Sequence, residues 1–178
     1  MKKTIRMPIL TIALAGLVLL AASAGLSPLR EENARRELET VMRAILPGSE
    51  AFTEEARAGE DPNIRAAYQS EAGWVVHVVT SGYVGDISML VGVSSGGVVT
   101  GLAVRDLKET PGLGGRALMD REFLAQFRNT RGNAAVGTDI DALTGATVTS
   151  KAVTRGVNSA VRFVTGADTS SGATTWGG

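Results

Sequence analysis

The sequence has no cysteine and only one histidine among its 178 residues. Without cysteine, the chain cannot form a disulfide, supply a thiolate nucleophile, hold an iron–sulfur cluster by thiolates or attach a c-type haem. The single His77 is too little for the multi-histidine sites of most catalytic zinc proteins. If such a chain transfers electrons, it does so through a bound cofactor.

The chain also lacks an excess of charge of either sign. It has 18 Lys and Arg residues against 18 Asp and Glu residues, which gives a formal net charge of zero at pH 7. Proteins that hold a phosphate backbone carry a basic patch or an overall positive charge. We therefore expect no nucleic-acid partner.

One long hydrophobic run lies near the N-terminus. Lys2, Lys3 and Arg6 precede residues 7–29, which carry no charged side chain and are rich in Leu, Ile, Val and Ala. A helix over this run reaches roughly 34 Å at about 1.5 Å per residue, enough to cross a hydrocarbon core of about 30 Å. The sequence predicts a single transmembrane anchor at 7–29 in the inner (plasma) membrane, in contact with lipid. Residues 1–6 are expected in the cytoplasm and the chain beyond residue 30 on the other side.

A cleaved signal peptide is the alternative interpretation of the same run. Ala22-Ser23-Ala24 matches the pattern of small residues at a cleavage site, and Ile9 to Leu20 has the length of a signal-peptide core. Both interpretations export residues 30–164 as one extracytoplasmic domain.

The exported part alternates between helical and extended patterns. Apolar residues at helical spacing predict helices over 31–46, 116–128 and 148–164, whereas β-branched runs between Gly-rich turns predict antiparallel strands over 73–81, 86–93 and 98–105. A further strand is expected near 134–136, and residues 51–63 are expected to form a loop with a possible short element. Residues 165–178 resemble a flexible Gly/Ser/Thr tail. The fold class is therefore α+β, with an antiparallel sheet flanked by helices.

The segment Asp141 to Thr147 (DALTGAT) stands at the start of the last predicted helix. Gly145 and Ala146 remove side-chain bulk beside Thr147, and a helix start offers unpaired amides and a positive dipole end. A phosphate ester would be held well there. The alternative is that Thr144 or Thr147 only caps the helix.

A second motif, ETPGLG, occupies residues 109–114 in the loop after the third predicted strand. Pro111-Gly112 fits the centre of a type II turn, and the further glycines leave backbone amides exposed to a flat or anionic ligand. The alternative is a tight surface turn with nothing bound.

Together the two motifs resemble the FMN-binding domain of the G subunit of Rnf-type ion-translocating electron transport complexes, a relative of the C subunit of sodium-translocating NADH:quinone reductase. The resemblance covers Lys2 to Val164. It implies covalent FMN, attached through a phosphoester to Thr147 by a flavin transferase that uses FAD and Mg²⁺. The cofactor-binding residues that it implies are Asp141, Thr144, Gly145, Ala146 and Thr147 in the first motif and Glu109, Thr110, Pro111, Gly112, Leu113 and Gly114 in the second.

The tail repeats the first motif as DTSSGAT at residues 168–174. We favour Thr147 over Thr174 as the modified residue because only Thr147 precedes a helix that could receive a phosphate. The alternative is that a transferase that reads only the short motif modifies both.

The resemblance implies an electron-transfer subunit, rather than a stand-alone enzyme, of an ion-translocating ferredoxin:NAD oxidoreductase complex, with the other Rnf subunits as partners. A protein of this kind supplies position and electrostatics, and the flavin supplies the redox chemistry. The alternatives are the quinone reductase C subunit, a free-standing exported flavin carrier, and an exported binding domain without redox function.

Overall fold

A computed structural model describes residues 32–55, 61–107 and 120–166 of the chain. The chain divides between Thr40 and Val41 into two compact units. Among the described residues, no helix is long and apolar enough to cross a bilayer. The anchor expected at 7–29, the loop motif at 109–114 and the tail from residue 167 lie outside them.

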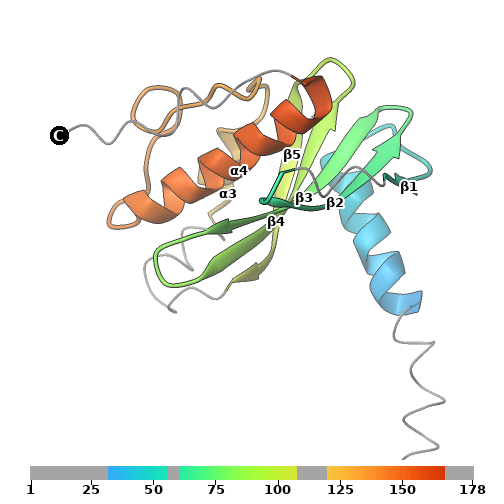
Figure 1. Ribbon diagram of the computed structural model, residues 1–178, viewed down its shortest axis with the longest axis horizontal. Coiled ribbons are helices and arrows are strands. Elements are labelled where there is room, and N and C mark those ends of the chain that lie inside the picture. The colour runs from blue at the N-terminus through green and yellow to red at the C-terminus, as the bar shows by residue number, and fades with distance from the viewer. Residues whose placement is uncertain (1–31, 56–60, 108–119, 167–178) are drawn as a thin grey trace, which may run out of the picture. The chain divides into compact units, whose positions relative to one another are not determined.

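The second unit is built on a five-stranded antiparallel sheet (Figure 1). Its strands follow the chain in space as β1-β2-β3-β4-β5, so that each strand pairs with the next along the sequence. Their bounds are β1 Thr53–Glu54, β2 Ile64–Ser70, β3 Gly73–Ser81, β4 Asp86–Ser94 and β5 Val99–Leu107. The three strands predicted from the β-branched runs are confirmed as β3, β4 and β5, which form an antiparallel meander.

Residues 64–70, for which no element was expected, form β2, and the two-residue β1 lies inside the segment expected to be a loop with a possible short element. Ala66 and Ala67 stand where β2 meets His77 and Val76 of β3. Alanine has a low β propensity. Pairing with β3 and burial of Ile64 and Ala67 in the core therefore decide this strand, rather than its own residues.

The long C-terminal helix predicted over 148–164 is confirmed as α4, Thr147–Thr165. Its Val153, Val157 and Val161 are buried against the sheet. Gly156 lets the helix approach closely, because an added Cβ would lie 2.8 Å from Met89 Cε and 3.1 Å from Thr80 Cγ2. Figure 1 shows α4 crossing one face of the sheet.

The helix predicted over 116–128 is shorter than expected within the described residues. α3 spans Arg121–Ala125, and turns follow it up to Asn129. Asp120 caps it by accepting hydrogen bonds from the N–H groups of Glu122 (2.9 Å) and Phe123 (3.3 Å). Phe123 and Phe127 are buried edge to face, with ring centroids 5.4 Å apart, so they join the core on the α4 side.

The strand expected near 134–136 is wrong. This segment makes only an isolated bridge between Val136 and Ile140. The backbone reverses at Gly137, which has φ +90°, and the N–H of Gly137 donates to the carbonyl of Ile140. Ala135 also donates its N–H to the Asp139 carboxylate. Local turns therefore use backbone N–H groups that a strand would donate to a neighbouring strand.

The other face of the sheet receives the end of a helix at residues 32–45, within the region predicted to be helical. Met42, Ile45 and Leu46 are buried. Gly92 and Gly101 are cross-strand partners, and a Cβ on Gly92 would lie 2.5 Å from the Ile45 carbonyl oxygen. The Thr100 hydroxyl donates to the same oxygen at 2.6 Å, so the helix end is fixed by close backbone approach.

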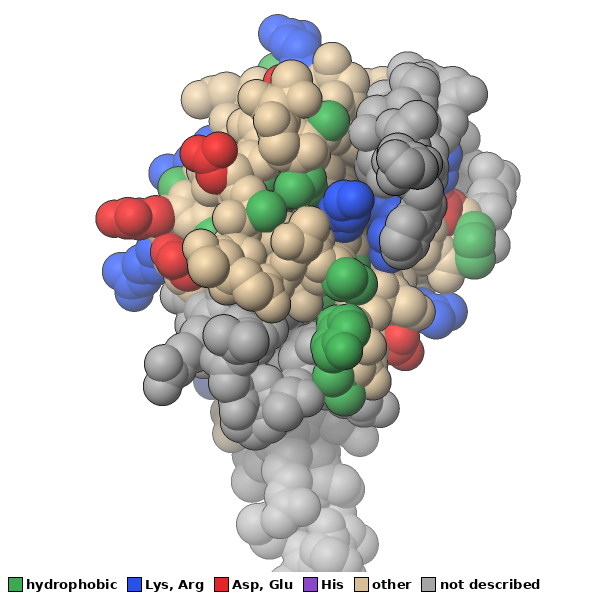
Figure 2. All heavy atoms as spheres, turned by 90° about the vertical axis from the view of Figure 1, so that its left-hand side faces the viewer, with side chains coloured by type: hydrophobic (Ala, Val, Ile, Leu, Met, Phe, Trp, Pro, Cys, Tyr) green, Lys and Arg blue, Asp and Glu red, His purple; other side chains and the backbone are tan. Residues whose placement is uncertain are grey.

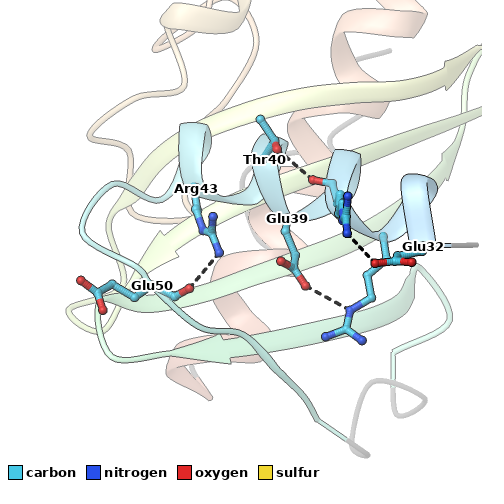
Figure 3. A network of polar contacts seen from close by, with 7 residues as sticks. Glu32, Glu39, Thr40, Arg43 and Glu50 are labelled. Atoms are coloured by element: carbon cyan, nitrogen blue, oxygen red, sulfur yellow. Dashed lines mark hydrogen bonds and ion pairs between the residues drawn. The ribbon is translucent and has the colours of Figure 1, made fainter.

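Figure 3 shows the polar contacts along this helix. Within the first unit, Arg35 pairs with Glu39 at 3.1 Å, and the Thr40 hydroxyl donates to the Arg36 carbonyl. Within the second unit, Arg43 donates to the carbonyl oxygen of Glu50. These exposed contacts add little to stability.

Candidate functional site

The residues just before α4 form a tight turn. The N–H of Ala146 donates to the carbonyl of Leu143 at 2.9 Å, and Gly145 has φ +78°. A type II turn requires its third residue to adopt the left-handed conformation, and glycine adopts this conformation without steric cost. The turn places Thr144 and Gly145 on the exposed surface, directly before the helix.

No side chain of the described residues closes the start of α4. The N-cap residue is Ala146, with φ −130° and ψ 36°, and it makes no side-chain cap bond. The described structure therefore does not support the alternative in which Thr144 or Thr147 caps the helix. Within the described ranges, the N–H groups of Thr147, Val148 and Thr149 have no hydrogen-bond partner.

Thr147 is the first residue of α4, and it is exposed. Its hydroxyl makes no hydrogen bond to any residue that the structure describes. The first turn of the helix carries no acidic residue, and the half-buried Lys151 follows it. An accessible hydroxyl beside free amides and without a nearby carboxylate on the helix suits a phosphate group.

Two residues that are not among the predicted site residues hold the motif in place. Ser150, fully buried, accepts a hydrogen bond from the Leu143 N–H and donates one to the Ala146 carbonyl. Gln126, which ends α3, accepts a hydrogen bond at 2.7 Å from the N–H of Asp141 through its side-chain oxygen. No sequence pattern points to Gln126, whereas Ser150 could have been noticed as a polar residue on the buried face of α4.

The structure brings together Asp141, Thr144, Gly145, Ala146 and Thr147, because they belong to one continuous segment. Asp141 is exposed and bound to Gln126 through its backbone. The second motif, 109–114, lies outside the described residues. Its preceding strand, β5, ends at Leu107, which is paired with Ile87, and Ile87 is paired with Thr80.

The start of α4 and the β3–β4 hairpin project at the same end of the sheet. Gly156 lies against Thr80, and Arg155 donates to the carbonyl of Ser81. The helix therefore begins toward the end of the sheet at which the β3–β4 hairpin turns (Figure 1).

The hairpin tip and the start of α4 both expose large hydrophobic side chains. Within the described part they are Tyr83 (75% exposed) and Val84 (56%) at the hairpin tip and Val148 (43%) beside Thr147. Figure 2 views the molecule from the side on which α4 begins and shows hydrophobic side chains on this face, with Lys or Arg beside them. Such a surface suits a ligand that has both an apolar ring system and an anionic group.

The described groups with shifted pKa values lie away from the start of α4. Burial lowers the pKa of His77, and Arg105 and Arg65 lower it further. His77 Nε2 lies 2.8 Å from the Ser88 hydroxyl. Its position alternates with Val76 and Val78, which belong to the core on the α4 side, so His77 points to the opposite face and takes no part in this site.

Comparisons with known proteins concern the sequence of the chain. Residues 82–162 match the family described as FMN-binding domain, a range that includes both the hairpin tip and the Thr147 turn. The chain is 31% identical over 163 residues to the G subunit of the proton-translocating ferredoxin:NAD(+) oxidoreductase complex of Clostridium ljungdahlii, covering 88% of this chain and 87% of that protein.

Two further relatives carry similar names. The G subunit of the Na(+)-translocating ferredoxin:NAD(+) oxidoreductase complex of Acetobacterium woodii is 40% identical over 91 residues, 47% of this chain and 44% of that protein, so this match spans less than half of its length. The G subunit of the ion-translocating oxidoreductase complex of Vibrio vulnificus is 26% identical over 154 residues, 73% of each chain.

Proposed function

Since the chain belongs to the family of G subunits of ion-translocating oxidoreductase complexes, we propose that it carries electrons within such a complex through FMN bound by a phosphoester to Thr147. The observation that carries the proposal is the open start of α4. There an exposed, unbonded hydroxyl stands beside three backbone amides with no partner among the described residues.

The residues at this site fit the cofactor. A phosphodiester keeps one negative charge, and a helix N-terminus stabilises such a charge by about 0.3 to 1 kcal/mol in an exposed setting. Gly145 and Thr144 leave the approach to Thr147 open, and the exposed Val148 and hairpin tip offer apolar surface to the ring. FMN, when bound, supplies reversible uptake and release of electrons, and the chain supplies its position.

Attachment requires a group transfer from FAD. The Thr147 oxygen forms a bond to the phosphorus on the FMN side of FAD, the phosphoanhydride bond breaks, AMP leaves, and the hydroxyl proton is released. A separate flavin transferase with Mg²⁺ would catalyse this step. Thr147 is thus a modification site, and the other residues of the first motif and Glu109–Gly114 are its proposed surroundings.

The proposed partners are the other subunits of the complex, because an electron carrier needs a donor and an acceptor. The two ferredoxin:NAD(+) relatives are named for different ions, so we assign no coupling ion to this chain. In the proposed topology, residues 7–29 anchor the chain in the inner membrane, residues 1–6 are cytoplasmic and the flavin domain is extracytoplasmic.

One alternative from the sequence, a binding domain without redox function, needs the motif threonines to act as helix caps. The uncapped start of α4 argues against it. Co-purification of the tagged chain from its native membranes tests the remaining alternatives. An Rnf-type chain brings ferredoxin:NAD oxidoreductase subunits with it, a quinone reductase chain brings those of that enzyme, and a free-standing carrier brings neither.

The first experiment is denaturing gel electrophoresis under ultraviolet light after co-expression with a flavin transferase. Wild type is compared with Thr147→Ala and with Thr174→Ala, the matched change in the repeated motif of the tail. We expect a fluorescent band in wild type and in Thr174→Ala and none in Thr147→Ala. A dark wild type in the presence of an active transferase would refute covalent attachment, and a band lost only in Thr174→Ala would move the site to the tail.

A further inference from the structure

We infer that Ser150 is a positioning residue for the modification of Thr147, because its buried hydroxyl holds the turn that presents the Thr147 hydroxyl. The inference rests on the proposed function and adds to it a residue outside both motifs. Ser150 does not touch the flavin in this scheme. It acts through the backbone of residues 143–146.

The Ser150 side chain joins both ends of the turn. Its Oγ accepts the Leu143 N–H at 3.2 Å and donates to the Ala146 carbonyl at 3.0 Å. Leu143 and Ala146 are also the first and last residues of the turn, joined by their own backbone bond. A hydroxyl has one donor and can accept as well, so a single oxygen fixes both residues.

Helix stability alone does not explain this serine. Thr154, one turn later and also buried, donates its hydroxyl to the Ser150 carbonyl at 2.9 Å in the same helical pattern. Such bonds to the preceding turn are neutral or slightly destabilising for a helix. The bond to Leu143 distinguishes Ser150, since it reaches out of α4 to the segment before it.

The hydrogen bonds of Ser150 affect the position of the Thr147 hydroxyl oxygen, which is the reacting atom. Ala146 immediately precedes Thr147, so a shift of the turn moves the Thr147 backbone and its hydroxyl with it. Group transfer depends steeply on alignment, and a misplacement of about 1 Å can cost about a hundredfold in rate. Removing the Ser150 hydroxyl leaves the Leu143 N–H without its partner and frees the turn to move.

The test measures flavin transfer to the full-length chain in detergent, with purified flavin transferase, FAD and Mg²⁺. Ser150→Ala removes both bonds, and Thr154→Val removes the comparable bond that does not reach the turn. At 25 °C, where both variants are shown to be folded, we expect Ser150→Ala to lose about tenfold or more in kcat/KM and Thr154→Val to stay within twofold of wild type. Prolonged incubation brings Ser150→Ala to the wild-type flavin content, because Thr147 is intact.

A second measurement reports on the turn without any flavin. In the unmodified protein, amide hydrogen exchange at Leu143 should be faster in Ser150→Ala than in wild type and unchanged in Thr154→Val. A change in overall stability alone would not separate the two variants in this way.

Each other result overturns the inference. Ser150→Ala at the wild-type rate, or with wild-type exchange at Leu143, shows that the hydroxyl does not position the turn. Equal slowing in Thr154→Val shows a general effect of the helix. If wild type is modified at Thr147 and Ser150→Ala is modified at the same rate, this inference is refuted and the proposed function stands. If wild type takes up no flavin, both the proposed function and this inference are refuted.

Discussion

The two helices on the same face of the sheet begin in opposite ways. α3 has five residues, yet the Asp120 side chain accepts hydrogen bonds from two of its first amides. α4 has nineteen residues and a buried face, yet no side chain of the described part of the chain caps it. A short helix needs a cap from its own chain, whereas a long one, held by packing, can leave its first amides open to a ligand. The proposed function rests on this difference between the two helix starts.

The largest expected effect comes from changing the turn before α4. Gly145 (φ +78°) precedes the open end, and Gly166 (φ +66°) closes the other end by donating its N–H to the Arg162 carbonyl. Gly145→Ala and Gly166→Ala should each lower the free energy of unfolding by about 1 to 2 kcal/mol, since both put a side chain in the left-handed region. Urea unfolding measures this loss.

Only Gly145→Ala should also slow flavin transfer, by about tenfold, because it alone displaces the hydroxyl. The transfer assay compares the two variants directly. An equal slowing in Gly166→Ala would mean that the two ends of α4 do not differ in function.

The second prediction compares the two helix starts by stability alone. Asp120→Ala should cost about 1 kcal/mol of unfolding free energy through loss of the α3 cap. Thr147→Ala should change it by less than about 0.5 kcal/mol, since the exposed hydroxyl has no partner in the described structure. Thermal and urea unfolding of the flavin-free protein check both values, and a loss of about 1 kcal/mol in Thr147→Ala would restore the capping interpretation.

The smallest expected effect on stability comes from an ion pair farther along α4. A guanidinium nitrogen of Arg162 lies 2.6 Å from a carboxylate oxygen of Asp61. Burial by itself raises the pKa of Asp61, but hydrogen bonds from Asn63 and the Arg162 guanidinium outweigh it and hold the pKa below its ordinary value. The folded state therefore binds this proton less readily than the unfolded state. The resulting stabilisation is present at neutral pH and is lost as the pH falls below about 4, through the folded pKa.

Asp61→Asn should accordingly lower stability at pH 7 by about 0.5 to 1 kcal/mol, a modest amount because Arg162 is partly exposed. Between pH 5 and pH 3 the variant should lose less stability than wild type, as measured by urea unfolding at each pH. Flavin transfer at pH 7 should not change. A slower transfer would show that the open end depends on this distant contact.

The sequence predicts the elements whose residues carry a strong pattern. The valine-rich runs of β3, β4 and β5 and the apolar stripe of α4 fall where expected. β2 escaped prediction because its alanines carry no strand signal and its conformation comes from pairing with β3. The false strand at 134–136 has apolar residues, but Gly137 and the Asp139 carboxylate turn the backbone there.

The candidate site was predictable in part for a similar reason. Gly145 and Thr147 stand in a continuous motif, so their proximity follows from the sequence itself. The identity of the N-cap depends on the backbone angles of Ala146, and the supports from Ser150 and Gln126 depend on tertiary contacts. Sequence patterns encode neither of these directly.

The turn before α4 also bears on the order of maturation. Its backbone bond, the Ser150 hydroxyl and the Gln126 amide are all supplied by the polypeptide, so the described part of the turn needs no cofactor to form. Under the proposed attachment to Thr147, folding therefore comes first and flavin addition second, and a cell short of flavin would accumulate the folded, flavin-free precursor.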